Sequence, residues 1–279
     1  MMNWNQLISA KRFGMEEFHE ERQENRSEFQ RDYDRLIFSA PFRRLQNKTQ
    51  VFPLPGSVFV HNRLTHSLEV ASVGRSLGDD VAKALLERHP ELQDSFLPEI
   101  GSIVSAACLA HDLGNPPFGH SGEKAISTFF SEGKGVRLKE KQPNGEQLSP
   151  MEWEDLIHFE GNANAFRILT HQFEGRRKGG FVLTYTTLAS IVKYPFSSSL
   201  AGTKSKFGFF VSEEESFRKI ATELGLILLN EHPLKYARHP LVYLVEAADD
   251  ICYQMMDIED AYKLKILTTE ETKELLMAY

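Results

Sequence analysis

Residues 102–123 have the sequence SIVSAACLAHDLGNPPFGHSGE, and this stretch decides the fold. Its first half is apolar or small, which predicts a buried helix over residues 99–111 that ends at the adjacent pair His111–Asp112. The following segment, 113–122, contains prolines and glycines that break regular structure, and a helix restarts at about Glu123. The polar pair is therefore expected at the edge of a core, where a metal ion can be held with restricted access of water.

Most of the chain on either side of this stretch also has helical periodicity. Helices are predicted over residues 15–38, 64–88, 151–174, 183–193, 213–230, 239–257 and 269–278. Loops are predicted over 51–60, 133–150 and 195–212, and the first and last of these leave room for a short hairpin. With few strand signals, no repeats and no clear linker, the sequence predicts one all-α domain over residues 1–279, a helical bundle with at most a small β-hairpin.

The overall charge limits the class of partner. A net charge of −7 gives no bulk attraction to nucleic acid or to an anionic membrane, so an anionic substrate needs a local cluster of Lys, Arg or metal. The N-terminus lacks the apolar core of a signal peptide, and no uncharged apolar stretch is long enough to span a membrane. Cys108 and Cys252 lie in apolar runs and are expected to be buried free thiols, which fits a cytoplasmic location.

Three residues and one acidic pair form a candidate metal site. They are His66, His111, Asp112 and an aspartate of EAADD at 246–250. Imidazole and carboxylate together suit Mg²⁺, Mn²⁺, Fe or Zn²⁺. The last two residues of EAADD are adjacent, hence about 100° apart on a helix, and only one of them can face such a site.

Longer strings around these residues resemble the HD-domain phosphohydrolases, and among them the bacterial dGTPase-like deoxynucleoside triphosphate (dNTP) triphosphohydrolases. The strings are RSEFQRDYDRLIFSAPFRRLQNKTQVF (26–52), HNRLTHSLEV (61–70), AHDLGNPPFGHSGE (110–123), HFEGNANAFRIL (158–169), IVKYP (191–195) and EAADDICYQMMDIED (246–260). They occur in the family's order and span about 26–260. Members of this family are usually longer, so the resemblance implies that a C-terminal helical part is missing or reduced.

The resemblance implies a ligand set and a sugar site. The implied metal ligands are His66, His111, Asp112 and Asp249. Asp249 is preferred because Tyr253 and Asp257 follow it at four-residue intervals and share its helix face, as in the family's pattern. In that pattern the tyrosine packs against the deoxyribose and the second aspartate bonds the 3′-hydroxyl. Gln46 resembles the family's other 3′-hydroxyl contact. The expected metal is Mn²⁺ or Mg²⁺, with Fe or Zn²⁺ as alternatives.

The resemblance also implies catalytic and phosphate-binding residues. His120 is expected to protonate the leaving 5′-oxygen, with Glu123 as its partner. The expected phosphate contacts are Arg63, Lys193 and Tyr194, with Asn115 and Glu160 as secondary candidates. The implied reaction is water attack at the α-phosphorus of a dNTP, which gives a deoxynucleoside and tripolyphosphate.

The resemblance extends to partners, and here the sequence leaves alternatives. It implies a homo-oligomer, and it leaves both an activating dNTP and nucleic-acid binding open. The arginines at 26, 31, 35, 43 and 44 favour helix packing or a subunit interface, with a regulatory nucleotide site as the alternative. Two other functions fit the metal residues: an HD-type nucleotidase or phosphodiesterase acting on another nucleotide, and a nucleotide-sensing protein with little turnover.

Overall fold

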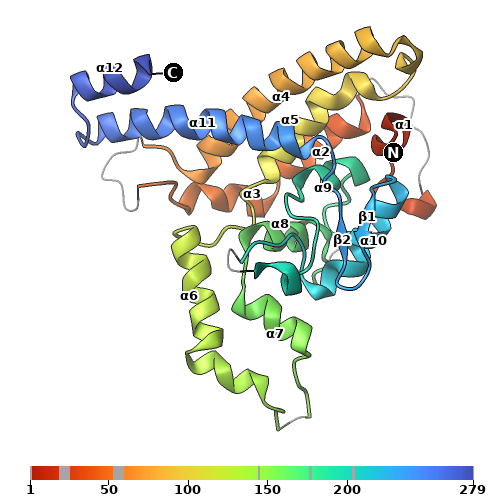
Figure 1. The fold of residues 1–279 in the computed structure, drawn as a ribbon, viewed down its shortest axis with the longest axis vertical. Helices are drawn as coiled ribbons and strands as arrows, with labels where there is room; N and C mark the ends of the chain where they lie inside the picture. The colour runs from red at the N-terminus through yellow and green to blue at the C-terminus, as the bar shows by residue number, and fades with distance from the viewer. Residues whose placement is uncertain are drawn as a thin grey trace.

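The computed structural model describes residues 2–18, 26–52, 60–143, 145–175, 178–202 and 205–278. Within these ranges the chain is mostly helical, with one two-stranded antiparallel sheet. Figure 1 shows the N-terminus beside the short helix α1 (Trp4–Leu7) and the C-terminus at the free end of α12 (Thr269–Met277). This arrangement confirms the prediction of a helical fold with at most a small hairpin.

The centre of the fold is a close pair of helices, α4 (Arg63–Arg88) and α5 (Ile100–Ala110). Every residue of α5 is buried, as its apolar and small sequence predicts. The two backbones approach closely because Gly78 faces Gly101, and a Cβ atom on Gly78 would lie 2.7 Å from the Cα of Gly101. The long helix α11 (Val242–Lys263) packs against both, so the three helices together form a platform.

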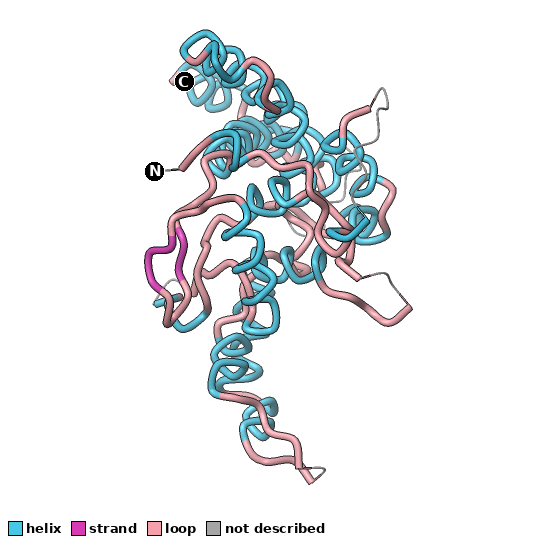
Figure 2. Tube along the Cα trace, turned by 90° about the vertical axis from the view of Figure 1, so that its right-hand side faces the viewer, coloured by secondary structure: helices cyan, strands magenta, loops and turns pink. Residues whose placement is uncertain are grey.

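Shorter helices cover this platform. Two of them, α2 (Glu28–Ile37) and α9 (Tyr185–Ile191), pack directly on α5. The other α-helices are α1 (Trp4–Leu7), α3 (Ala40–Arg44), α6 (His120–Ser131), α7 (Pro150–Ile157), α8 (Gly161–Thr170), α10 (Glu214–Glu223) and α12 (Thr269–Met277). The pair α6–α7 extends away from the platform as an arm, which both views show (Figures 1 and 2).

Two predicted helices end earlier than expected. The helix predicted over 151–174 is two helices, because Glu160 leaves helical geometry and its side chain caps α8 by accepting from the backbone N–H groups of Asn162 and Ala163. The helix predicted over 213–230 stops at Glu223, because Gly225 adopts a φ of 65° and closes a Schellman-type end.

The remaining differences concern strands and turns. The small hairpin is formed by β1 (Leu228–Asn230) and β2 (Lys235–Tyr236), and not by the loop predicted at 195–212. The loop predicted at 133–150 contains a 3₁₀ turn, Lys134–Lys139. Parts of the helix predicted over 15–38 and of the loop predicted over 51–60 lie outside the described residues.

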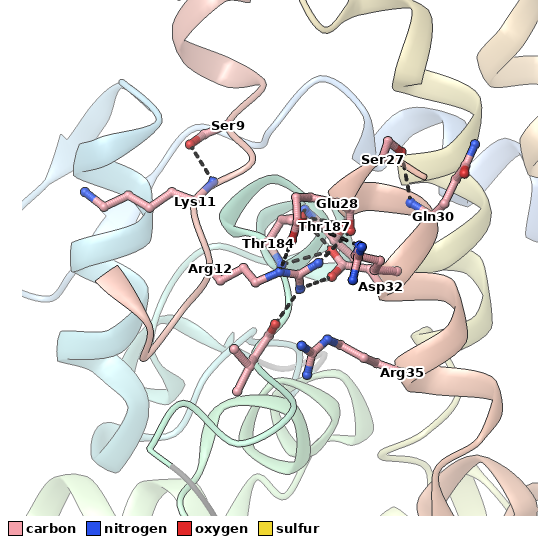
Figure 3. Close-up of polar contacts among 12 residues, drawn as sticks. Ser9, Lys11, Arg12, Ser27, Glu28, Gln30, Asp32, Arg35, Thr184 and Thr187 are labelled. Carbon is pink, nitrogen blue, oxygen red and sulfur yellow. Dashed lines mark hydrogen bonds and ion pairs between the residues drawn. The ribbon is translucent and has the colours of Figure 1, made fainter. Parts of the chain in front are cut away.

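A buried polar network joins the N-terminal segment to the core (Figure 3). The Arg12 guanidinium donates to Asp32 Oδ1 at 2.7 Å and to the Val182 carbonyl at 2.7 Å, and it also pairs with Glu28. Asp32 Oδ2 accepts the hydroxyl of Thr184, the N-cap of α9, at 2.6 Å. Because these groups are buried and paired, they fix α2 and α9 against each other beside α5.

Two further sequence expectations concern the core and membranes. Cys108 and Cys252 are buried free thiols, as predicted. In the part of the chain that the structure describes, no helix is both long and apolar enough to cross a membrane.

Candidate metal centre

Four predicted ligands from three helices meet at one end of the platform. His66 belongs to the first turn of α4, which starts where it does because Asn62 accepts from the N–H groups of Leu64 and Thr65. His111 and Asp112 follow the last residue of α5. A ligand atom from each of His66, His111 and Asp112 lies within 4.8 Å of the others.

Asp249, from α11, completes the group. Its Oδ1 lies 3.0 Å from Nε2 of His66 and 3.5 Å from Nε2 of His111. The Nε2 of His111 in turn lies 3.7 Å from Oδ1 of Asp112. The neighbouring Asp250 is exposed. Adjacent residues on an α-helix point about 100° apart, so only Asp249 faces the cluster.

The orientation of His111 fits a metal ligand. Its Nδ1 lies 2.6 Å from the carbonyl of Cys108, one turn earlier, and therefore carries the proton and donates. Its Nε2 is buried and has no hydrogen-bond partner among the described residues. An unpaired buried imidazole nitrogen is costly, and a cation between His111 and the two carboxylates would satisfy it.

The electrostatics of the cluster favour a bound cation. Burial alone would lower the pKa of His111, but the charges of Asp112 and Asp249 raise it to about 9. Burial would raise the pKa of Asp249 and of Asp112. The combined attraction of His111 and His66, with Arg63 in addition at Asp112, outweighs burial and holds both pKa values below their usual range. Two carboxylates are thus held ionised in a confined space, which a divalent ion can neutralise.

The ligands form the floor of a pocket of about 610 Å³. A volume of this size suits a small molecule. The predicted residues in its lining are Arg63, His66, His111, Asp112, Asn115, His120, Glu123, Glu160, Lys193, Tyr194, Asp249 and Tyr253. Twelve side chains predicted from separate motifs therefore share one cavity.

Three cationic side chains in the lining are each paired with acids. Arg63 Nη1 donates to Asp112 Oδ2 at 2.7 Å, and Lys193 lies 3.0 Å from Glu246. Lys206 lies 2.8 Å from Glu160. Sequence reasoning missed Lys206, because it lies in a Gly- and Ser-containing loop with no motif that distinguishes it from a solvated lysine.

His120 and Glu123 lie in the first turn of α6, and both line the pocket. His120 is exposed, whereas Glu123 is buried. The Glu123 carboxylate accepts the N–H of Gly161 at 2.8 Å and lies 3.6 Å from Lys206. In the described structure Glu123 therefore anchors the start of α8 and Lys206, and its carboxylate is not engaged with His120.

The predicted sugar contacts are only partly brought together. Tyr253 lines the pocket, and burial, followed by the charge and hydrogen bond of Asp257, raises its pKa. Asp257 itself is not among the lining residues. Gln46 is exposed in a 3₁₀ turn and does not line the pocket, whereas Gln50 does, with a buried Oε1 that has no partner in the described structure.

The two secondary candidates, Asn115 and Glu160, both line the pocket but make different contacts. Asn115 donates through Nδ2 to Asp112 Oδ1 in a short hydrogen bond, which orients that carboxylate. Glu160 is almost fully buried and caps α8 while it pairs with Lys206. Asn115 therefore supports a candidate ligand, whereas Glu160 holds Lys206 at the start of α8.

Comparison with known proteins places this site in a class. Residues 63–177, which contain three of the four ligands, match the HD domain family. The fold and the His–Asp cluster therefore define an HD-domain protein, and the cluster implies a divalent metal.

Relatives narrow the class to a family. The chain is 46% identical over 99% of its length to a deoxyguanosinetriphosphate triphosphohydrolase-like protein of Pseudomonas aeruginosa, and 45% identical over 95% of its length to a protein of the same name in Synechocystis. It is 36% identical to the deoxyguanosinetriphosphate triphosphohydrolase of Yersinia enterocolitica over 97% of its length. The chain belongs to this triphosphohydrolase-like family of HD-domain proteins. It spans 61%, 61% and 57% of these three relatives.

Proposed function

We propose that the chain hydrolyses a deoxynucleoside triphosphate at a divalent metal centre and releases a deoxynucleoside and tripolyphosphate. The observation that supports this proposal is the convergence of His66, His111, Asp112 and Asp249 at the floor of a pocket that also holds Arg63 and other cations. The names of the relatives point to the same substrate class.

The four ligands fit a divalent ion through two imidazoles and two ionised carboxylates. When bound, the ion supplies positive charge for a phosphate oxygen and acidifies water for attack at phosphorus. Mn²⁺ or Mg²⁺ is our first choice, and Fe or Zn²⁺ are the alternatives. His111 is held in the correct tautomer by the Cys108 carbonyl, and Asp112 is oriented by Asn115 and Arg63.

The cations of the pocket bind the triphosphate. A triphosphate carries several negative charges, and one divalent ion does not neutralise them. Arg63, Lys193 and Lys206 are each positioned by an acidic partner within 3.0 Å, and each keeps further N–H groups that can donate to a phosphate. Tyr194, whose ring lies 5.9 Å from the Lys193 ammonium, completes this wall of the pocket.

The leaving group is the 5′-oxygen of the nucleoside, which needs a proton as the bond to phosphorus breaks. His120 is exposed to the pocket and is free to donate it. Glu123, three residues later in the same helical turn, keeps its position through Gly161 and Lys206 and lines the same pocket.

The sugar is recognised by the α11 residues and one glutamine. Tyr253 presents its ring to the pocket, and Asp257 fixes the Tyr253 side chain through their hydrogen bond. Gln50, with its unpaired Oε1, takes the role that the sequence assigned to Gln46 and accepts the 3′-hydroxyl. A ring and an amide close to the sugar leave little room for a 2′-hydroxyl.

The family resemblance implies a homo-oligomer and leaves an activating dNTP open. A second pocket, of about 710 Å³, includes Arg35, Arg43, Arg44 and Lys48 in its lining. We assign the activating nucleotide to this pocket because its lining is basic and contains no acidic side chain among the described residues.

The reaction is tested by product analysis. Purified protein is incubated with each of the four dNTPs and Mn²⁺ or Mg²⁺, and the phosphorus products are separated by anion exchange. We expect tripolyphosphate and the deoxynucleoside in equal amounts, and the four rates measure the base preference. Pyrophosphate or orthophosphate would refute the assigned reaction. Activity on monophosphates alone would indicate a nucleotidase, and binding without turnover would indicate a sensor.

A further inference from the structure

One turn at the mouth of the pocket has an unusual residue in its third position. The N–H of Gly119 donates to the carbonyl of Pro116 at 3.1 Å and closes a four-residue turn. Phe118, the third residue, has a φ of 65°. Glycine or asparagine normally occupies such a position, because a β-carbon in this region crowds the backbone, and a bulky aromatic residue there is an outlier.

Core packing does not account for Phe118. Its side chain is 56% exposed, and it belongs to neither of the hydrophobic clusters of the described chain. Its ring contacts no other aromatic ring in the described residues. The side chain instead lines the pocket that contains the metal ligands. A strained backbone and an exposed aromatic ring therefore coincide at a binding site, where strain of this kind is typically found.

The turn is held rigidly from both sides. Two consecutive prolines, Pro116 and Pro117, restrict its first half. On the other side Gly119 has no side chain, and a Cβ there would lie 2.8 Å from Nη2 of Arg63. Arg63 is itself fixed by Asp112. The ring of Phe118 is thus presented by a turn that is fixed against the phosphate-binding and metal-binding residues.

We propose that Phe118 is the platform on which the nucleobase of the substrate stacks. This inference rests on the proposed function. The phosphates are assigned to the cationic wall and the sugar to Tyr253, so the base lies beyond the sugar. Among the described lining residues, the exposed large apolar side chains are Val51, Phe118 and Tyr253. A flat exposed ring binds any base through its π face, which gives affinity with little dependence on base identity.

Two substitutions at position 118 separate binding from strain. Phe118→Asn removes the ring and places a residue that tolerates positive φ, so the thermal unfolding midpoint should be unchanged or higher. Phe118→Trp keeps a stacking ring and should keep nucleoside binding. Phe129→Asn is the control, because Phe129 is 47% exposed on α6 but does not line the pocket.

The test uses the two reaction products, which bind without turnover. Dissociation constants of a deoxynucleoside and of tripolyphosphate are measured with Mn²⁺ by ligand-observed NMR and calorimetry. Phe118→Asn should weaken deoxynucleoside binding by at least about fivefold, the lower end of base–aromatic stacking, and change tripolyphosphate binding by less than about twofold. Phe118→Trp and Phe129→Asn should match the wild type.

The outcomes are distinguishable from failure of the proposed function. Equal deoxynucleoside affinity in the wild type and Phe118→Asn would overturn the stacking role. The absence of deoxynucleoside binding by the wild type would overturn it too. So would a loss of deoxynucleoside affinity in Phe118→Trp as large as that in Phe118→Asn. Absence of dNTP hydrolysis and of tripolyphosphate binding in the wild type would instead overturn the proposed reaction. Nucleoside binding that depends on Phe118 would still stand in that case.

Discussion

The Oδ1 atom of Asp249 lies 3.0 Å from Nε2 of His66, although 183 positions separate the two residues in the sequence. The contact joins α11 to the first turn of α4, and His111 from the end of α5 lies beside it. Three helices of the central platform thus each contribute to one polar cluster. The packing that forms the core also sets the geometry of the metal site.

Substitution of the two adjacent aspartates distinguishes a ligand from a surface charge. Asp249→Asn should lower metal-dependent hydrolysis by about 100-fold or more, because loss of even a group that only orients a ligand costs about 10- to 100-fold. Asp250→Asn, at an exposed position, should leave the rate near that of the wild type. Steady-state rates with Mn²⁺ measure both, and similar losses in the two variants would contradict the assignment.

Removal of the proposed acid should affect the chemical step. His120→Ala should lower kcat by roughly 10²- to 10⁴-fold, the usual contribution of a general acid, with little change in KM or in Mn²⁺ binding. His120 is exposed and its side chain has no hydrogen bond or ion pair with another described residue, so the fold should be retained. His89→Ala, an exposed site at the end of α4, is the control. A rate for His120→Ala equal to that of the control would exclude the acid role.

The two glutamines of the 46–50 segment should differ. Gln50→Ala should reduce kcat/KM for a dNTP by roughly five- to tenfold, the effect of one lost hydrogen bond. The ratio of kcat/KM for a dNTP to that for the corresponding ribonucleotide should also become smaller. Gln46→Ala should match the wild type because its side chain is exposed outside the pocket lining. The reverse order of effects would restore Gln46 as the sugar contact.

His239 should make stability depend on pH. Burial lowers its pKa from 6.5 to about 4, and its Nδ1 accepts the N–H of Leu241 at 3.2 Å, which requires an unprotonated nitrogen. Below pH 6.5 the unfolded chain therefore binds a proton that the folded chain does not. The contribution of His239 to the free energy of unfolding is therefore fully present above pH 6.5. It is lost as the pH falls from 6.5 to 4, by roughly 3 kcal/mol.

Urea unfolding at pH 7 and pH 4.5 measures this effect. The free energy of unfolding of His239→Gln should fall less over that interval than that of the wild type. His89→Gln, at an exposed position, should behave like the wild type. Equal pH dependence in all three proteins would show that His239 does not titrate in this way.

Much of the site could be predicted because its residues belong to local motifs. His111 and Asp112 follow a helix whose burial is evident from its composition, and the four-residue spacing of Asp249 and Tyr253 fixes a helix face. Together with the family resemblance, which implied the choice of Asp249, these patterns named the candidate metal ligands before their convergence was visible. The Schellman end at Gly225 was missed, although a glycine there signals a helix end.

Other features depend on tertiary contacts that no local pattern encodes. Gln46 and Gln50 lie in the same short segment, and only the direction of the chain after the 3₁₀ turn decides which side chain reaches the pocket. Lys206 is placed by Glu160 and Glu123, residues distant in sequence. The strain at Phe118 is a backbone angle and has no signal in residue type.

The most direct test of the metal centre is the stoichiometry of Mn²⁺ binding, measured by calorimetry and by the loss of the free-ion EPR signal. Metal-free wild-type protein should bind one ion per pocket, and His111→Ala should lose this binding while its helical circular dichroism is retained. His89→Ala should bind as the wild type does. Unchanged Mn²⁺ binding in His111→Ala, or no binding by the wild type, would contradict the account.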